Sequence, residues 1–338
     1  MLTKSPENGV VSGSPVAGWR WWSIGAITGL GALWLALSCG SLSCSDFSSL
    51  PPEIREMRGE RVLAAFCVGG LLSLAGGLLQ LLLRNPLADP YVLGVSSGAA
   101  AGALVFTILL PGALGIYSLQ LGALTGAVTA IGLLFLFAGR VLWGGPITIE
   151  PASSGIRLIL TGVMISSAFS ALVSLMFSLS PDVQLRGTLF WLMGDLEGSD
   201  FIGLSVLALF ASTTWALSNA ALLNILSMGE VGAHLLGLPV RRLQVGTLVV
   251  ASIATASAVT VAGAIGFIGL VVPHSLRLLI GNDQRRLLPA SVFVGGVVLA
   301  IADLLARTLI APTQLPVGVI TALVGAPVFL FLLARSRS

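Results

Sequence analysis

The sequence predicts an all-α membrane protein with about ten transmembrane helices, and three observations lead to this fold class. Of the 338 residues, 56% are hydrophobic and only 9% are charged, whereas about a quarter of a soluble domain is charged. The mean hydropathy is +1.00. Apolar runs of about 20 residues, the length that crosses the hydrocarbon layer, recur along the chain. The 41 glycines follow no fixed period, which excludes a collagen-like chain.

Charges, prolines and glycine clusters divide the chain into ten apolar segments, each of which we expect to form one span. The eighth segment is short, and Pro273 inside it predicts a kinked or tilted helix. The expected spans are Trp21–Leu42, Arg61–Leu83, Val92–Leu110, Ser118–Gly139, Leu158–Leu179, Phe201–Leu222, Leu243–Val261, Gly266–Ile280, Leu287–Ala306 and Val317–Leu333.

The distribution of Lys and Arg orients these spans, because cytoplasmic loops carry the excess of positive charge. With the amino terminus inside, twelve of the seventeen basic residues fall on the cytoplasmic side. The five on the outer side are Arg55, Arg58, Arg61, Arg186 and Arg307. This distribution predicts both termini in the cytoplasm, with a cytoplasmic tail at 1–20. An eight-span chain with one re-entrant helical pair would also satisfy it. The basic residues form no stripe, so nucleic acid is not an expected partner.

Glycines recur at four-residue spacing in the third and fourth expected spans, at Gly94, Gly98 and Gly102 and at Gly122 and Gly126. In lipid, small residues let two helix backbones approach and pack by van der Waals contact. We therefore expect a tightly packed bundle. A glycine-lined passage is the alternative interpretation.

Two connections are longer than a simple turn requires. The stretch 180–200 predicts a short amphipathic helix outside the membrane at Val183–Met193, ended by glycine. On the inner side, about 225–242 predicts two short helices broken by glycines. A cytoplasmic loop of this length and mixed polarity is suited to docking a partner protein.

Isolated polar residues allow more limited predictions. Cys39 and Cys44 lie near the end of the first span, where a disulfide is conceivable, but small buried residues are the favoured interpretation. Asp303 is the one acid well inside a span, and Arg307, one helical turn away, is its expected partner. His274 follows Pro273, and we expect it to stabilise the kink by a hydrogen bond. His234 has no second ligand at metal-binding spacing, so no metal site is expected.

The run Arg84-Asn85-Pro86-Leu87-Ala88-Asp89-Pro90-Tyr91-Val92-Leu93-Gly94 closely resembles a signature of the FecCD permeases, the membrane subunits of type II ABC importers for iron-siderophores, haem and cobalamin. Further runs resemble other signatures of the family. They are Gly263-Ala264-Ile265-Gly266-Phe267-Ile268-Gly269, Leu315-Pro316-Val317-Gly318 and Trp191-Leu192-Met193-Gly194. The resemblance covers the chain from about Glu53 to its end.

The resemblance implies a type II ABC importer permease fold with a single transmembrane permease domain at 21–338. It also implies a homodimer or a pair of close paralogues, two ABC ATPase subunits and an extracytoplasmic binding protein. The expected location is the cytoplasmic (inner) membrane of a bacterium or archaeon. No G-x-x-x-x-G-K-[ST] phosphate loop occurs in the sequence. We therefore expect no enzyme activity in this chain, with ATP and Mg²⁺ bound by the partner ATPase.

The family's functional positions can be transferred by motif. Docking of the binding protein would involve Arg58, Arg61 and Arg307, although arginines at helix ends also snorkel without any partner. A cytoplasmic gate would involve Asn85, Leu87, Ser153 and Ser154, and Asn85 is alternatively a cap of the third span. ATPase coupling would involve Glu230, His234, Gly237, Leu238, Pro239 and Arg241.

Iron-siderophore is the expected cargo, with cobalamin and haem as alternatives, because the family's motifs do not separate them. The competing class is an ion-coupled secondary transporter, which needs several buried acids and inverted repeats. A membrane scaffold would leave the gate turn and the coupling loop without a role.

Overall fold

The computed structural model describes the backbone of residues 15–40, 44, 47–109, 117–143, 152–179, 182–197 and 201–336. Side chains are described over the same part except at 15–24, 139–143, 152–154, 182–186 and 335–336. Within these ranges the regular elements are helices, with one isolated β-bridge between Cys39 and Cys44. The elements are α1 (Pro15–Ser38), η1 (Phe47–Ser49), α2 (Pro52–Leu82), η2 (Pro90–Leu93), α3 (Val95–Leu109), α4 (Ser118–Trp143), α5 (Ala152–Leu179), α6 (Asp182–Leu192), α7 (Ile202–Ser218), α8 (Ala220–Ser227), α9 (Glu230–Leu235), α10 (Val240–Ala262), α11 (Ile268–Ile280), α12 (Gln284–Thr308) and α13 (Val317–Ser336).

Each of the ten predicted spans overlaps a helix, and the sixth falls on two, α7 and the start of α8. Six helices of the described part, α2, α4, α5, α10, α12 and α13, are long and apolar enough to cross a bilayer. The bent pair α7 and α8 makes a seventh when it is counted as one span. The other three predicted spans correspond to α1, α3 and α11, which are apolar but shorter over their described residues. The all-helical membrane fold is confirmed, and the count of ten spans stays a prediction.

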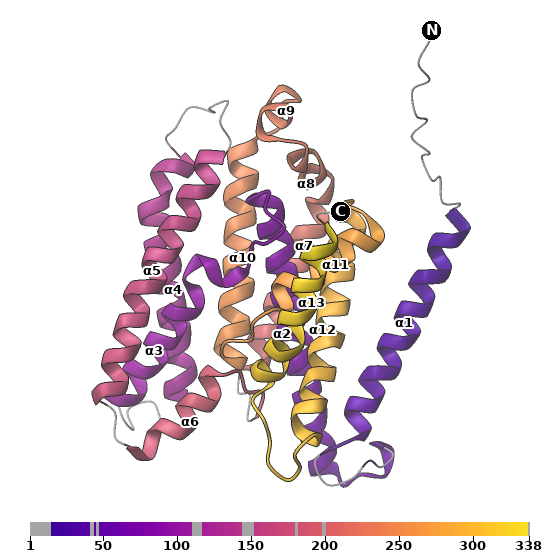
Figure 1. The fold of residues 1–338 in the computed structure, drawn as a ribbon, viewed down its shortest axis with the longest axis vertical. Helices are drawn as coiled ribbons and strands as arrows, with labels where there is room; N and C mark the ends of the chain where they lie inside the picture. Colours follow the sequence, from indigo (N-terminus) through magenta and orange to yellow (C-terminus); the bar gives the residue numbers. More distant parts are fainter. Residues whose placement is uncertain are drawn as a thin grey trace.

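The helices run between two ends of the molecule (Figure 1). At one end lie α8, α9, the start of α1 and the end of α13; we call it the α9 end. At the other end, which we call the disulfide end, lie α6 and the connection from α1 to α2. Helix α1 therefore starts, and α13 finishes, at the same end of the described part.

Helix α2 forms the centre of the fold, because 89% of the residues in its 18-residue apolar segment are buried. It packs against α7, α10, α11 and α12. Glycines make the closest approaches: Gly69 lies against the backbone of Gly295 on α12, and Gly76 lies against the backbone of Gly269 on α11. Because lipid provides little hydrophobic driving force between helices, this backbone-to-backbone contact is what van der Waals packing requires.

Two glycines of the predicted stripe in the third span face the stripe of the fourth, whereas Gly94 lies before α3 and packs against Gly162 and Ile165 of α5. Gly98 and Gly102 on α3 contact the backbone of Gly126 and Gly122 on α4, with no room for a side chain at any of the four. The packing interpretation is therefore confirmed. Together with α5, these helices form the group on the left of Figure 1.

Several predicted boundaries were wrong. The sixth span is broken at Asn219, where α7 and α8 meet at a bend of 64°; the Asn219 amide donates to the Trp215 carbonyl at 2.9 Å. Helix α1 begins at Pro15, inside the predicted tail of 1–20, and residues 1–14 lie outside the described part. The predicted short helix after the fifth span is confirmed as α6, whereas the stretch 225–242 holds the end of α8 and one short helix, α9, in place of the two predicted.

We predict that Gly76→Val destabilises the protein by about 1–3 kcal/mol, the usual effect of overpacking, because its side chain would clash with the backbone of Gly269. Gly132→Val on α4 is the matched control, since no atom lies within 4 Å of a Cβ there. The thermal unfolding midpoints of both variants in detergent provide the measurement. Equal midpoints would contradict the packing model.

Candidate functional site

An ion-pair network joins α2 and α12 near the disulfide end. The Arg61 Nε donates to Asp303 Oδ1 at 3.0 Å, and the Arg307 Nε lies 3.1 Å from Asp303 Oδ2. The Arg61 Nη1 also donates to Gln314 Oε1 at 2.9 Å. The Asp303 side chain is only 1% exposed, so its charge is balanced by two arginines rather than by water.

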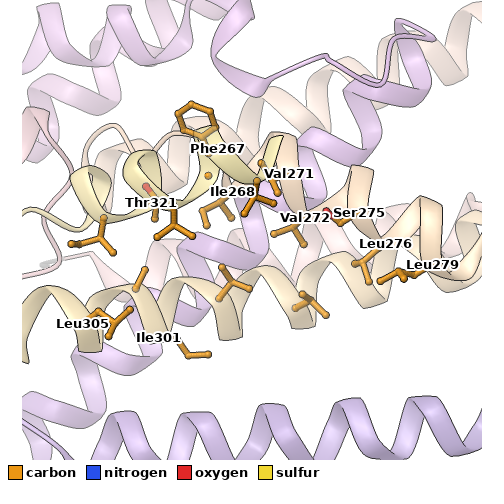
Figure 2. A pocket seen from close by; sticks show the side chains of 17 residues that line it. Phe267, Ile268, Val271, Val272, Ser275, Leu276, Leu279, Ile301, Leu305 and Thr321 are labelled. Atoms are coloured by element: carbon orange, nitrogen blue, oxygen red, sulfur yellow. The ribbon is translucent and has the colours of Figure 1, made fainter. Parts of the chain in front are cut away.

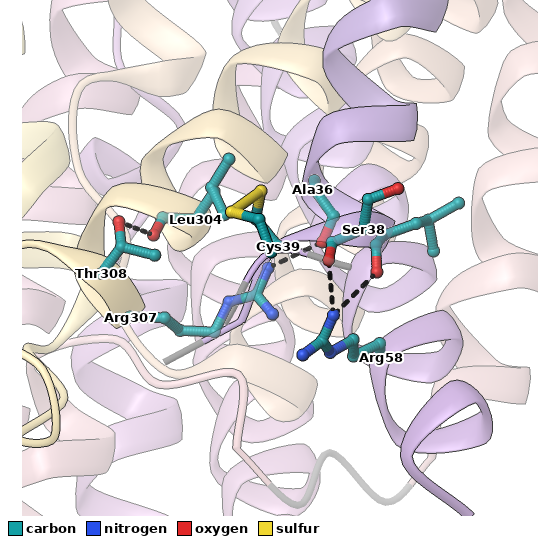
Figure 3. The surroundings of a disulfide bond; sticks show 9 residues. Ala36, Ser38, Cys39, Arg58, Leu304, Arg307 and Thr308 are labelled. Atoms are coloured by element: carbon teal, nitrogen blue, oxygen red, sulfur yellow. Dashed lines mark hydrogen bonds between the residues drawn. A yellow bond between two sulfur atoms is a disulfide. The ribbon is translucent and has the colours of Figure 1, made fainter. Parts of the chain in front are cut away.

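The same region satisfies the last carbonyls of α1 (Figure 3). The Arg58 Nη1 donates to the Ser38 carbonyl at 2.7 Å, and the Arg307 Nη2 donates to the Ala36 carbonyl at 3.2 Å. A helix leaves its last four carbonyls without intrahelical partners, and arginine is suited to bind them. We call Arg58, Arg61 and Arg307 the arginine cluster. Directly after α1, Cys39 and Cys44 form a disulfide.

The structure brings the three predicted docking arginines together. The predicted pairing of Asp303 with Arg307 is confirmed, whereas the second partner, Arg61, was missed. The favoured interpretation of Cys39 and Cys44 as unpaired residues was wrong. Arg307 is only 4% exposed, so it does not present its guanidinium to a partner in this conformation. Docking by the cluster stays a prediction.

Four runs of sequence that are far apart in the chain meet in a signature junction between α3, α6, α10, α11 and α13. The Tyr91 hydroxyl donates to the Ile265 carbonyl at 2.9 Å and accepts from the Ile265 N–H at 2.7 Å. The Val317 N–H donates to the Gly194 carbonyl at 2.9 Å. Tyr91 was not singled out by sequence reasoning. Its position within the first signature run was the available signal.

The predicted gate turn lies at the α9 end. The Asn85 Oδ1 accepts from the Leu87 N–H at 2.9 Å, closing an Asx turn. Asn85 therefore caps this turn, and the alternative that it caps the third span was wrong. Leu87 is 43% exposed. Ser153 and Ser154 lie in the first turn of α5, and their side chains are outside the described part.

The gate turn and the coupling loop touch. Arg84 has a left-handed backbone conformation, with φ of 47°, and a Cβ at Gly229 would lie 3.6 Å from its Nη2. Gly229, with φ of 129°, immediately precedes α9. The Arg84 guanidinium therefore lies beside the residue at which α9 begins.

Helix α9 and the residues that flank it expose an apolar surface. Met228, Leu235 and Leu236 are 79%, 81% and 67% exposed, and sequence reasoning did not single them out. Among the predicted coupling residues, His234, Gly237, Pro239 and Arg241 are exposed, Glu230 is partly exposed and Leu238 is buried. Leu238 therefore anchors the loop to the core rather than facing a partner. Exposed apolar side chains at a loop tip are typical of a protein–protein contact.

The predicted role of His274 was wrong. Neither ring nitrogen has a hydrogen-bond partner among the described residues, and the ring packs edge-on against Phe329 with centroids 6.4 Å apart. Gln80 on α2 instead donates to the Leu270 carbonyl at 3.1 Å, in the turn before Pro273. A polar side chain from the neighbouring helix thus supports the proline-containing turn of α11.

A groove of about 350 Å³ runs between α11, α12 and α13, and Figure 2 shows the side chains that line it. Only Ser275 and Thr321 contribute hydroxyl groups, and the Thr321 hydroxyl is bound to the Gly318 carbonyl at 3.0 Å. Specific small-molecule sites combine an apolar wall with several placed polar groups. This wall has no charged group to recognise a metal chelate.

Comparison with known proteins places these features in a family. The model of the FecCD transport family matches residues 22–335. The hemin transport system permease protein HmuU of Yersinia pestis is 40% identical, over 83% of each chain. The vitamin B12 import system permease protein BtuC of Klebsiella pneumoniae is 40% identical, over 84% of this chain and 83% of its own.

One solved structure extends the comparison to three dimensions. It is described as an inward-facing conformation of a metal-chelate type ABC transporter and superposes with a TM-score of 0.78. It is 30% identical and covers 95% of this chain and 99% of its own. The likeness therefore includes the whole helical arrangement.

We predict that Asp303→Asn destabilises the protein by about 3–5 kcal/mol, since it leaves two buried guanidinium groups without a counter-charge. Asp283→Asn is an isosteric control, because Asp283 lies at the surface and an amide oxygen can still accept the Arg285 N–H that it caps. Differential scanning calorimetry in detergent would compare the two. Similar unfolding temperatures would show that the network contributes little.

Proposed function

The chain belongs to the FecCD transport family and is an ABC importer permease, and from this premise we propose that it imports an iron-siderophore chelate. A binding protein would deliver the chelate at the disulfide end, and ATP hydrolysis by partner subunits at the α9 end would drive its passage. Residues 21–338 would act as one permease domain in the cytoplasmic membrane of a bacterium or archaeon, with both termini and α9 inside.

The contact between the gate turn and the coupling loop carries this proposal. Arg84 adjoins Gly229 at the start of α9, so a force applied to α9 acts on the turn that holds Asn85 and Leu87. The exposed apolar residues of α9 offer a surface for the ATPase. ATP and Mg²⁺ would bind that partner, because the chain has no phosphate-binding loop.

A second copy of the chain, or a close paralogue, would complete the passage. In α5 and in α13, only 17% of the residues in the 18-residue apolar segment are buried, against 89% in α2. Met164 on α5 and Leu330 on α13 are 63% and 66% exposed. These two helices are therefore the least buried of the long spans in the described part, and we place the second copy against them.

The cargo proposal draws on the chemistry that the relatives' names share. Haem and vitamin B12 are both large metal chelates, and the solved relative is a metal-chelate type transporter. The two relatives are named for different chelates but are equally similar to this chain, at 40% identity. Sequence identity therefore does not indicate which chelate this chain carries. Cobalamin is the alternative cargo.

The ion-coupled alternative has a specific observation against it. Asp303 is held by Arg61 and Arg307. Both carboxylate oxygens are therefore already engaged by guanidinium groups, and the one acid expected well inside a span takes part in a structural ion pair.

The arginine cluster would contribute to docking of the binding protein, with Arg58 and Arg61 more accessible than Arg307. Charge-assisted pairs to acidic residues of a partner set the docking register and raise the association rate.

Reconstitution tests the import function. In proteoliposomes with the cognate ATPase and binding protein, we expect uptake of a ferric siderophore that depends on ATP. The matched control carries an ATPase with an inactivated catalytic residue, and uptake should then fall to background. Uptake that continues with the inactive ATPase would refute an ATP-driven importer, and uptake of cobalamin in place of the siderophore would reassign the cargo.

We further predict that Gly237→Ala lowers ATP-dependent uptake. Gly237 has φ of +78°, a left-handed conformation that costs an alanine roughly 1–2 kcal/mol, so the loop after α9 would change shape. Gly203→Ala on α7 serves as control, because the site is open and helical. Uptake per assembled complex is the measurement, and equal uptake by both variants would contradict a role for this loop in coupling.

A further inference from the structure

Helix α8 is joined to the start of α12 by a pair of short hydrogen bonds. The Asn224 Nδ2 donates to Asp283 Oδ1 at 2.7 Å, and the Gln284 N–H donates to Asn224 Oδ1 at 2.7 Å. Asp283 is also the N-cap of α12, where its Oδ1 accepts from the Arg285 N–H at 3.1 Å. One amide side chain therefore bridges the cap residue and the first residue of α12.

The chemistry of this bridge requires asparagine. An ionised carboxylate only accepts hydrogen bonds, and a backbone N–H only donates, so the amide uses both its donor and its acceptor. The hydrogen bond from Asn224 is the main cause that lowers the pKa of Asp283 from its usual value. Asp283 is thus ionised at neutral pH. An aspartate at position 224 would supply two acceptors where one donor is needed.

The bridge lies between two parts with assigned roles. Helix α8 leads through Gly229 into α9, the proposed ATPase contact. Helix α12 runs without a break from Gln284 to Thr308 and carries Asp303, which holds Arg61 and Arg307 near its other end. The chain itself connects α9 directly to α8 and to α10, whereas it reaches α12 only after passing through α10 and α11. Among the hydrogen bonds described for α8 and α9, those of Asn224 with Asp283 and Gln284 lead to α12.

We propose that Asn224 and Asp283 form a positioning joint, through which displacement of α8 and α9 by the ATPase moves α12 and, with it, the arginine cluster. Asn224 is a positioning residue that acts through α12 and touches neither ATP nor cargo. This inference rests on the proposed function of α9, and it adds a route from the α9 end to the face where the binding protein would dock. Side-chain bridges of this kind couple two sites only when they carry a displacement between them.

Three variants test the joint in the assembled complex with ATPase and binding protein. Asn224→Asp places a second carboxylate against that of Asp283 and removes the Nδ2 group that donates to it. Asp283→Asn alone keeps the acceptor at this position, since its amide oxygen can accept from Asn224 Nδ2 and from the Arg285 N–H. The double variant N224D/D283N reverses the direction of the side-chain bond, because Asn at 283 would donate to Asp at 224, and so restores the link between α8 and α12. It gives up the bond from the Arg285 N–H, because that bond shares the same Oδ1 of Asp283.

The expected result is uncoupling in one variant only. With Asn224→Asp, cargo transported per ATP hydrolysed should fall about five- to tenfold, within the usual range for coupling between sites. Asp283→Asn and the double variant should remain within about twofold of the unmodified complex, the spread expected from small local changes. A merely structural role would lower the yield of complex but leave the ratio of cargo to ATP unchanged, and that result would overturn the proposal.

Hydrogen exchange gives a second readout that does not depend on cargo. ATP binding to the complex should change amide exchange in the first turns of α12, at 284–288, in the unmodified protein and in the double variant. The change should be absent in Asn224→Asp. Equal changes in amide exchange in all three proteins would overturn the proposal of a joint. A complex that shows the exchange pattern but takes up no chelate would refute only the proposed cargo function.

Discussion

The structure depends on one constraint: a chain in lipid must pair its backbone polar groups within the protein. Helices meet this requirement along most of the sequence, but α10 ends at Ala262 and α11 begins at Ile268. Between them, Tyr91 pairs both the N–H and the carbonyl of Ile265. The Asp195 N–H donates to the Ala262 carbonyl at 3.0 Å. The signature junction is therefore the means by which the fold accommodates broken helices.

The same constraint explains where glycine and arginine occur. Gly263 lies against the Trp191 carbonyl and Gly318 against the Met193 carbonyl, so a side chain at either position would separate the loops that pair each other. At the end of α1, the carbonyls that have no helical partner are bound by Arg58 and Arg307. Charge is scarce in this protein, and two of the arginines on the outer side of the predicted topology complete a helix end.

Local sequence patterns predicted most of the helices and the contacts within them. The spacing of four residues predicted that Asp303 pairs with Arg307, and glycine spacing predicted the packing of α3 on α4. Contacts between distant residues were not predictable in this way: Arg61 meets Asp303 across 242 positions, and Gln80 rather than His274 supports the turn before Pro273. The bend at Asn219 was missed because no proline or glycine marks it. The roles of the docking, gate and coupling residues came from family resemblance, since no local pattern assigns a partner.

These contacts limit how the molecule can move. Helices whose backbones touch through glycine cannot slide without separating, so α3 with α4, and α2 with α11 and α12, should each move as a unit. Tyr91 and the gate turn that precedes it connect the first group to the second. Along the chain, α2 leads into α3 through residues 83–94, where Arg84 has a left-handed backbone conformation and lies beside Gly229. A shift between the two groups and a shift of α9 would therefore meet at this connection.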